Sequence, residues 1–294
     1  MLLPCHLQKR IELAVQSISY KSESVGPDLA VSLQDSGFAI LRDHPLPGPL
    51  LDTVYEDWLA FFDSDEKQAY VASENSVAEG RGGFYPVEIS ETAIEHTAKD
   101  LKEFFQVGAA GPIPPACKDG ILRYRELGFA LGQELLEWLQ RFTPEAVTAA
   151  LSEPLPGMLC REASLLRVLH YPPLNGGEEA GAVRAAPHED INLLTILPVA
   201  NQGGLQVRDS AGNWTDVSGN RGDLVINSGD MLREATGGYY PSATHRVINP
   251  GGDISNDSRL SVPLFLTARF DVKLSDRYTS GSYLDERIRL LHRQ

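Results

Sequence analysis

Hydrophobic and polar residues follow two different rhythms along this chain, and the change falls near residue 160. Before it, apolar residues recur at helical spacing over 27–37, 49–62 and 121–142. The first two segments begin at a proline and the first ends at a glycine, as helices commonly do. The third places leucines 131, 135, 136 and 139 on one stripe, which predicts a helix covering a core.

After residue 160, short apolar or alternating segments recur between clusters of Gly, Asn, Asp and Pro. Such spacing predicts many short strands, in a sandwich or a jelly roll. A hairpin is expected around 209–213, and the tail from 282 to 294 is expected to form a last short helix. The segments expected as strands are SLLRVLHY, NLLTILP, GLQVRD, DLVINS, THRVIN and RLSVPLFLTARF, with FAILRD earlier in the chain.

No repeat or linker interrupts the chain, so residues 1–294 are expected to form a single globular unit. Within it we predict a helical and mixed region over 1–155, a β core over 160–272 and a tail over 273–294. A chain of 294 residues with 42% hydrophobic content can build a substantial core.

The net charge of −14 argues against a general affinity for nucleic acid or anionic membranes, which attract basic surfaces. Three widely spaced cysteines, Cys5, Cys117 and Cys160, form neither a C-x-x-C pair nor a disulfide framework. No signal-like stretch opens the chain, and no apolar run reaches the length of a membrane span. We therefore expect a cytoplasmic protein, a monomer or weak homo-oligomer, without nucleic-acid or membrane partners.

Candidate chemistry begins in the stretch APHEDINLLTILP, where His188 and Asp190 stand two residues apart. In an extended segment both side chains point to one face and Glu189 points away. A third ligand should come from the same half, and His245, in SATHRVINP, suits this better than His170. Two histidines and one carboxylate form the facial triad of non-haem Fe(II) oxygenases. On these residues alone, a capped turn or a buried hydrogen-bonded histidine is the competing interpretation.

A second signal lies further along, where Arg259 and Ser261 share one face of an apolar segment. An arginine pointing into a core is costly unless an anion compensates its charge. A carboxylate bound by both side chains would do so, and a carboxylate-bearing co-substrate fits beside a metal. The alternative is an internal ion pair with a protein carboxylate.

The ordered set HEDINLLTILP, THRVINP and RLSVPLFL resembles the isopenicillin N synthase-like branch of the 2-oxoglutarate/Fe(II) dioxygenases. QDSGFAILRDHPLP, DLKEFFQVG and LLRVLHYPP extend the likeness over most of the chain. The resemblance implies a mainly β fold with flanking α: a double-stranded β-helix (jelly roll) core with N-terminal helices packed around it.

Carried over by position, the resemblance implies roles for six residues. It makes His188, Asp190 and His245 the iron ligands, and Arg259, Ser261 and Tyr171 the residues that hold the distal carboxylate of 2-oxoglutarate. The chain departs from many plant members at Leu169, where those have Asn, so that one polar contact is absent.

The implied activity uses Fe(II), O₂ and 2-oxoglutarate as co-substrate. It couples decarboxylation of 2-oxoglutarate to succinate and CO₂ with C–H oxidation of a small molecule by hydroxylation, desaturation or cyclisation. Isopenicillin N synthase itself is the alternative, because its Arg-x-Ser pair binds a substrate carboxylate and it needs no 2-oxoglutarate. That enzyme also has a glutamine near its C-terminus, and Gln294 ends this chain. A non-catalytic binding protein of the same fold is a third interpretation.

The resemblance leaves the primary substrate open among amino acids, peptides and secondary metabolites. We predict that substrate contacts come from the N-terminal helices, the EGRGGFYP segment and the tail. For each candidate, surface charge or an ordinary core aromatic is the competing interpretation. The candidates are Arg81, Phe84, Tyr85, Arg161 and Phe270.

Overall fold

Two β-sheets form the β core of the computed structural model, which describes residues 15–73, 82–89, 99–108, 111–209 and 211–291. The larger sheet has the order β1-β2-β10-β7-β13-β5-β4-β3, with β12 also paired to β5. Its strands are β1 (Gln16–Ser19), β2 (Phe38–Arg42), β3 (Gly83–Tyr85), β4 (Glu103–Val107), β5 (Leu159–Tyr171), β7 (Leu194–Pro198), β10 (Leu224–Ser228), β12 (Arg259–Ser261) and β13 (Leu264–Ala268).

The smaller sheet has the order β6-β11-β8-β9. Its strands are β6 (Ala185–His188), β8 (Leu205–Arg208), β9 (Trp214–Asp216) and β11 (His245–Val247). A hairpin joins β8 to β9 as expected, and the amide of Asp209 donates to the carbonyl of Asn213 at 2.9 Å.

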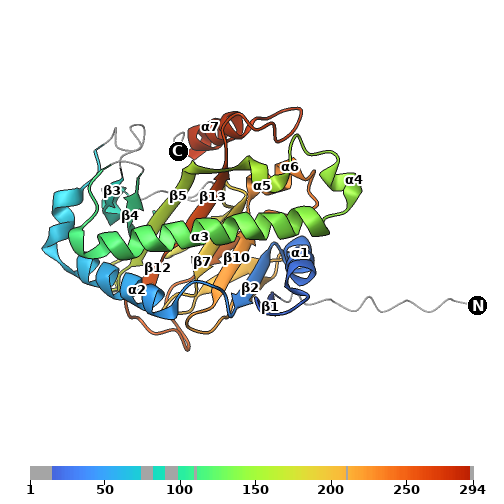
Figure 1. The fold of residues 1–294 in the computed structure, drawn as a ribbon. Helices are drawn as coiled ribbons and strands as arrows, with labels where there is room; N and C mark the ends of the chain where they lie inside the picture. Colours follow the sequence, from blue (N-terminus) through green and yellow to red (C-terminus); the bar gives the residue numbers. More distant parts are fainter. Residues whose placement is uncertain (1–14, 74–81, 90–98, 109–110, 210, 292–294) are drawn as a thin grey trace, which may run out of the picture.

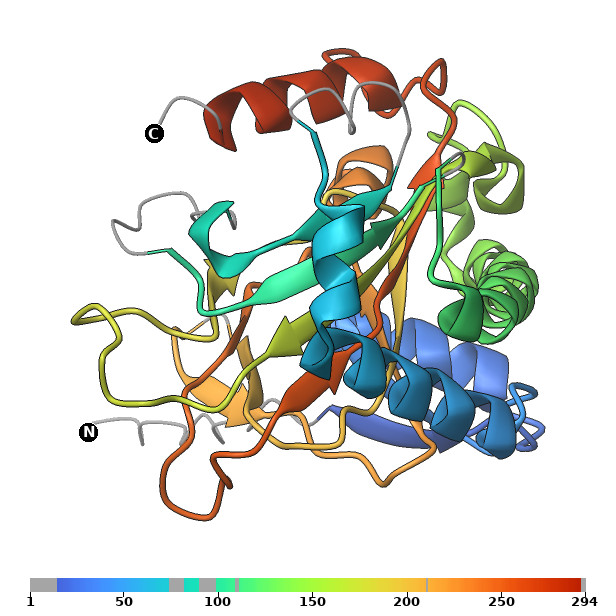
Figure 2. The ribbon, with the colours of Figure 1, turned by 90° about the vertical axis from the view of Figure 1, so that its left-hand side faces the viewer.

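Three helices cover the outer face of the larger sheet: α1 (Val25–Ser36), α2 (Gly48–Asp63) and α3 (Pro115–Phe142). Figure 1 shows α3 running across that face, and the perpendicular view in Figure 2 shows all three on the same side of the sheet. The remaining helices are η1 (Asp65–Tyr70), η2 (Val87–Ile89), α4 (Glu145–Thr148), α5 (Leu155–Met158), α6 (Asp230–Ala235) and α7 (Ser280–Leu291). In the described ranges, no helix combines the length and apolarity needed to cross a bilayer.

Helix α3 packs closely on β13 because it has a glycine where the two elements meet. A Cβ added to Gly128 would lie 2.7 Å from Cδ2 of Leu264, closer than a real side chain approaches. The helix begins six residues before the predicted start at 121. Its first turn opens at Pro115, which suits a helix N-terminus but adds little to the apolar periodicity.

Strand β5 separates the two cores of the protein. Its residues Leu166 and Val168 are buried beneath the helices. The alternate residues Leu169 and Tyr171 face the smaller sheet, where Tyr171 belongs to a second apolar cluster with Val207. The space between the sheets is therefore walled by alternate residues of both.

The structure confirms the mainly β class with flanking helices. The predicted strand over 259–270 is wrong as a single element, because it divides into β12 and β13 around Pro263, which has no amide proton for the ladder. Four strands from the N-terminal half join the larger sheet. The division into 1–155, 160–272 and 273–294 stays a prediction.

Candidate metal centre

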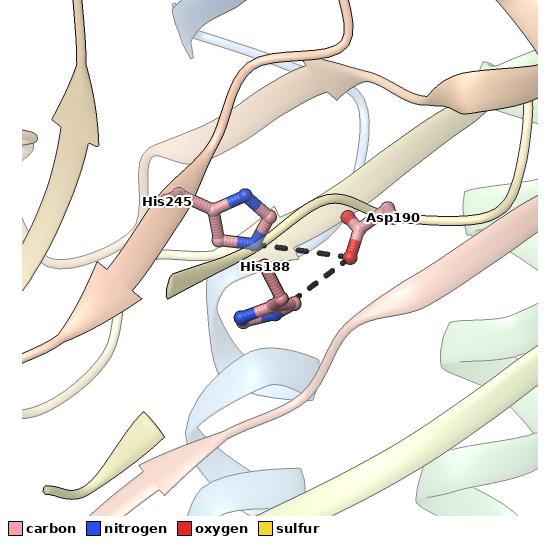
Figure 3. Close-up of side chains that lie close together, drawn as sticks. All are labelled: His188, Asp190 and His245. Atoms are coloured by element: carbon pink, nitrogen blue, oxygen red, sulfur yellow. Dashed lines mark ion pairs between the residues drawn. The ribbon is translucent and has the colours of Figure 1, made fainter. Parts of the chain in front are cut away.

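The three residues predicted as ligands converge at one point between the sheets. His188 ends β6, Asp190 follows it, and His245 begins β11, directly opposite His188 in the ladder. The Oδ1 atom of Asp190 lies 3.7 Å from Nε2 of His245 and 4.0 Å from Nε2 of His188. One ligating atom from each residue lies within 4.8 Å of the others. Figure 3 shows both imidazoles beside the carboxylate.

Backbone carbonyls orient both imidazole rings. The Nδ1 atom of His188 lies 2.8 Å from the carbonyl of Ala186, and that of His245 lies 3.1 Å from the carbonyl of Ala243. A hydrogen bond from Nδ1–H to a carbonyl leaves Nε2 with its lone pair free, which is the form that binds a metal. Each Nε2 atom is the one that lies nearest the carboxylate of Asp190.

Asp190 is held in a comparable way. Its Oδ2 accepts hydrogen bonds from Thr195 Oγ1 at 2.6 Å and Asn227 Nδ2 at 2.8 Å, so Oδ1 is left to face the histidines. Burial would raise the pKa of Asp190, but the charges of His245 and His188 and these two hydrogen bonds outweigh it and lower the pKa. The carboxylate is therefore ionised at neutral pH, as a metal ligand must be.

The environment also keeps His188 in its ligating form. Burial, and next the neighbouring His245, lower the pKa of His188 to about 4. The imidazole is then neutral at pH 7. His170, the alternative third ligand, lies elsewhere: its Nδ1 is 2.8 Å from Glu103 Oε1 and its Nε2 is 3.0 Å from Ser258 Oγ.

Arg259 and Ser261, the residues predicted to bind a carboxylate, line the same cavity. Arg259 is only 2% exposed, and its Nε donates to the carbonyls of Gln202 and Gly203. Its Nη1 is buried and has no partner in the described part of the chain, which is the donor that a bound carboxylate would use. The cavity walls include, besides the three ligands, Tyr171, Thr195, Leu205, Asn227, Arg259 and Ser261.

Sequence reasoning missed several polar residues of this site. Thr195 and Asn227 stand in apolar strands, and inward-facing polar residues at alternate strand positions were the available signal. Arg184, which is not among the residues that line the cavity but whose charge interacts with that of Arg259, was also missed. It is 0% exposed, donates from Nη2 to the carbonyl of Asp257 at 3.0 Å, and has Nε and Nη1 without partners among the described residues.

Of the residues predicted to bind substrate, the four that the structure describes do not line this cavity. The prediction that Phe84 contacts substrate is wrong. Its side chain is 0% exposed and packs in the outer core against Phe61 and Phe62, because β3 turns it towards the helices. Tyr85, its neighbour, faces the other way and stacks on Phe104 with ring centres 4.5 Å apart.

Arg161 and Phe270 are likewise not among the residues that line the cavity. Arg161 lies at the opposite end of β5 from Tyr171, and its guanidinium packs over Phe129 of α3. Phe270 is 57% exposed, just beyond β13. Arg81 and Gln294 lie outside the described residues.

Comparison with known proteins agrees with this geometry. A family model described as the 2OG-Fe(II) oxygenase superfamily matches residues 162–268. A solved structure from Shewanella oneidensis, assigned as an oxygenase, is 43% identical, with a TM-score of 0.83, over 95% of this chain and 98% of its own. The chain belongs to the 2OG-Fe(II) oxygenase superfamily.

More distant relatives extend the comparison of this oxygenase. A bifunctional coumaroyl-CoA and feruloyl-CoA ortho-hydroxylase from Ruta graveolens is 29% identical over 274 residues, which cover 89% of this chain and 71% of the relative. A full-length Neurospora crassa protein, solved in complex with alpha-KG, is 20% identical, with a TM-score of 0.76, over 96% of this chain and 98% of its own, and it shows the shared fold.

The jelly-roll prediction is confirmed by these solved structures. The predicted enzyme class, with Fe(II) and 2-oxoglutarate as cofactor and co-substrate, is confirmed by the family. The donor set fits the metal, since two imidazoles and one carboxylate leave further positions free on an octahedral ion.

Proposed function

We propose that this oxygenase binds Fe(II) through His188, Asp190 and His245 and oxidises a C–H bond of a small organic molecule, by hydroxylation, desaturation or cyclisation. The reaction consumes one O₂ and one 2-oxoglutarate for each substrate molecule oxidised, and it releases succinate and CO₂. Bound Fe(II) would supply the redox chemistry that couples the decarboxylation to the C–H oxidation.

One observation carries this proposal: the ligand atoms and an uncompensated buried guanidinium share a single cavity. Asp190 and Arg259 both line it, and Nη1 of Arg259 has no partner among the described residues. A buried cation without an anion is costly, so a site that keeps one is suited to an anionic ligand. A molecule with a metal-chelating end and a distant carboxylate satisfies both ends of the cavity, as 2-oxoglutarate does.

Each part of the cavity has a separate task in this reaction. Arg259 and Ser261 hold the distal carboxylate with charge-assisted hydrogen bonds, and the Tyr171 ring packs beneath the guanidinium. Carbonyls 186 and 243 keep the imidazoles directed at the metal. The apolar walls exclude water from the reacting atoms.

A small-molecule primary substrate is supported by the relatives. The Ruta graveolens protein is named for the ortho-hydroxylation of coumaroyl-CoA and feruloyl-CoA. For this chain we propose the wider class of amino acids, peptides and secondary metabolites. The net charge of −14 supports the exclusion of nucleic acid. A cytoplasmic location and a monomeric or weakly oligomeric state stay predictions.

The test measures O₂ consumption and succinate in purified protein supplied with Fe(II), with and without 2-oxoglutarate. A library of small molecules is then screened for compounds that accelerate succinate release. We expect succinate that depends on 2-oxoglutarate and is lost in Asp190→Ala.

Two results would overturn the proposal. Oxidation of a library compound without 2-oxoglutarate would place the protein with the isopenicillin N synthase type. Absence of Fe(II) binding in titrations of the purified chain would favour a non-catalytic binding protein.

A further inference from the structure

Glu189 stands between two proposed metal ligands, yet its side chain leaves the metal and joins two other segments. Its Oε2 lies 2.8 Å from Nη1 of Arg233 in α6. Its Oε1 accepts a hydrogen bond from Thr244 Oγ1 at 3.1 Å. The residue therefore bridges the loop of His188 and Asp190 to helix α6 and to the residue that precedes β11.

The hydrogen bond between Glu189 and Thr244 lies beside an irregularity in the pairing of β6 and β11. Thr244 directly precedes His245, so this bond joins the segments that carry all three ligands. The backbone ladder between these segments is irregular: His245 pairs with His188, but Val247 pairs with Ala185, which leaves a bulge on β6. A side-chain bond beside the bulge supplies a connection that the ladder does not.

Helix α6 binds the same loop a second time. Arg233 pairs through Nη2 with Oδ1 of Asp230 at 2.9 Å. The amide of Asp230 donates to the carbonyl of Asp190 at 2.8 Å. Glu189 and Asp190 are thus both tied to α6, one through its side chain and one through its backbone.

The C-terminal helix α7 supports α6 from outside. Tyr283 donates from its hydroxyl to Oδ2 of Asp230 at 2.9 Å, and Nη2 of Arg287 donates to the Tyr283 hydroxyl at 2.7 Å. Asp230 is only 3% exposed, so this junction is buried. In both ribbon views α7 lies over one end of the two sheets.

We propose that Glu189 is a positioning residue that fixes the His188–Asp190 loop against the His245 segment, with α6 and α7 as its support. The inference rests on the proposed function, because it concerns the same metal centre. Ligands from two segments bind a metal more tightly when their relative placement is already fixed, since less conformational freedom is lost on binding. Glu189 contributes that fixation without touching the metal.

A positioning role and a purely stabilising role predict different unfolding temperatures. If Glu189 only stabilised the fold, its loss would lower the unfolding temperature. The side chains of Arg233 and Glu189 are 34% and 30% exposed, and ion pairs this accessible contribute little to global stability. Loss of the pair should therefore weaken metal binding while the unfolding temperature hardly changes.

The chain offers a matched control in the pair Glu153–Arg269. Its atoms lie 2.7 Å apart, with side chains 30% and 39% exposed, and it links the segment before α5 to the end of β13. Glu189→Gln and Glu153→Gln each remove one charge from a comparable ion pair. Thr244→Val removes the second contact of Glu189 and leaves its charge in place.

The experiment measures Fe(II) affinity anaerobically in the full chain by competition with a chelator, together with the unfolding temperature and 2-oxoglutarate affinity at saturating Fe(II). Glu189→Gln and Thr244→Val should weaken Fe(II) binding about 10-fold, as changes in groups that orient metal ligands do. Tyr283→Phe should shift it in the same direction by less. Glu153→Gln should match the wild type, and the affinity for 2-oxoglutarate should be unchanged in all variants.

The outcomes separate this inference from the proposed function. If the wild type binds Fe(II) and forms succinate but Glu189→Gln binds Fe(II) as tightly, the positioning role is wrong and the proposed function stands. A second result would also contradict the positioning role. If Glu189→Gln lowers the unfolding temperature together with the Fe(II) affinity, while Glu153→Gln changes neither, Glu189 is a stabilising residue only. A wild type that binds no Fe(II) overturns both proposals.

Discussion

Arg259 and Tyr171 are direct partners in the ladder between β12 and β5, and the guanidinium carbon of Arg259 lies 5.2 Å from the centre of the Tyr171 ring. The aromatic face offsets part of the cost of burying the cation, and the carbonyls of Gln202 and Gly203 accept from its Nε. Nη1 is left for a ligand. The pair thus prepares a cationic end of the cavity before a carboxylate arrives.

Replacing Arg259 should abolish tight binding of 2-oxoglutarate and spare the metal. Arg259→Met removes a fork of charge-assisted bonds, and we expect the dissociation constant of 2-oxoglutarate to rise about 100-fold or more. Arg259→Lys keeps a positive charge but cannot form two parallel hydrogen bonds, so its dissociation constant for 2-oxoglutarate should lie between those of the wild type and Arg259→Met. Calorimetric titration with 2-oxoglutarate, beside an Fe(II) titration, measures both effects. Undiminished 2-oxoglutarate affinity in Arg259→Met would remove Arg259 from the site.

The candidate metal ligands could be selected from the sequence because strand geometry and ligand chemistry leave a recognisable pattern, and the family resemblance then implied their role. An H-x-D pair puts two ligands on one face, and a later histidine in a strand-like segment completes the set. Arg259 was visible for a similar reason, since a charge in the middle of an apolar strand needs an explanation. Each of these patterns spans a few neighbouring residues, so it can be recognised in the sequence without knowledge of the fold.

The residues that support the ligands could not be predicted in this way. Thr195 and Asn227 come from β7 and β10, which are neighbours only in the folded sheet. Phe84 and Tyr85 were indistinguishable as candidates, because only the register of β3 decides which one faces the core. Glu189 was correctly expected to point away from the metal, but its partner in α6 depends on tertiary packing.

Arg184 should strengthen 2-oxoglutarate binding through its charge. Burial, and next the positive charge of Arg259, lower the pKa of Arg184, so two like charges oppose each other in the protein alone. A bound anion is attracted by both. Arg184→Met should therefore weaken 2-oxoglutarate binding on the order of 10-fold, while the free protein unfolds at a temperature no lower than the wild type.

The control for this prediction is Arg246→Met. Arg246 lies on β11, where its guanidinium packs over Trp214 at 4.0 Å, and like Arg184 it is not among the residues that line the cavity. Burial alone lowers the pKa of Arg246, whereas the charge of Arg259 also lowers that of Arg184, so the two variants differ in their coupling to Arg259. Titration calorimetry and thermal unfolding of both variants without ligand and with 2-oxoglutarate make the comparison. Equal 2-oxoglutarate affinities in the two variants would contradict a role for the Arg184 charge.

Acid sensitivity should depend on the buried carboxylate of Glu103. Burial alone would raise its pKa, but hydrogen bonds from His170 and Lys67 outweigh burial and hold the pKa below its usual 4.5. A depressed carboxyl pKa stabilises the fold fully above pH 4.5, and this stabilisation is lost as pH falls through the folded value. Glu103→Gln should thus be less stable than the wild type near neutrality, and the difference should shrink in acid.

Unfolding temperatures measured from neutral pH into acid check this dependence. Glu126→Gln is the control, because the Glu126–Arg123 pair is 60% and 56% exposed and should change little at any pH. A difference between Glu103→Gln and wild type that stays constant down to the lowest pH would show that the Glu103 charge is not what stabilises the fold.

Gly229 should be needed for the close contact between α6 and the metal loop. Its backbone is extended, with φ −110° and ψ −179°, so alanine is conformationally permitted there. A Cβ at this position would nevertheless lie 2.7 Å from the carbonyl oxygen of Asp190 and would also meet Asn192. Gly229→Ala should push α6 away from the loop, cost about 1–3 kcal/mol of stability and weaken Fe(II) binding.

Gly251→Ala is the control for this last substitution, since an added Cβ there meets nothing within 4 Å. Both variants trade one glycine for alanine, so the difference between them reports the crowding at Gly229 and not the change in chain entropy. Chemical denaturation and Fe(II) titration of both variants decide the matter. If Gly229→Ala is as stable as Gly251→Ala and binds Fe(II) as tightly, the loop can move to accommodate the added methyl group without displacing the metal ligands, and the prediction is wrong.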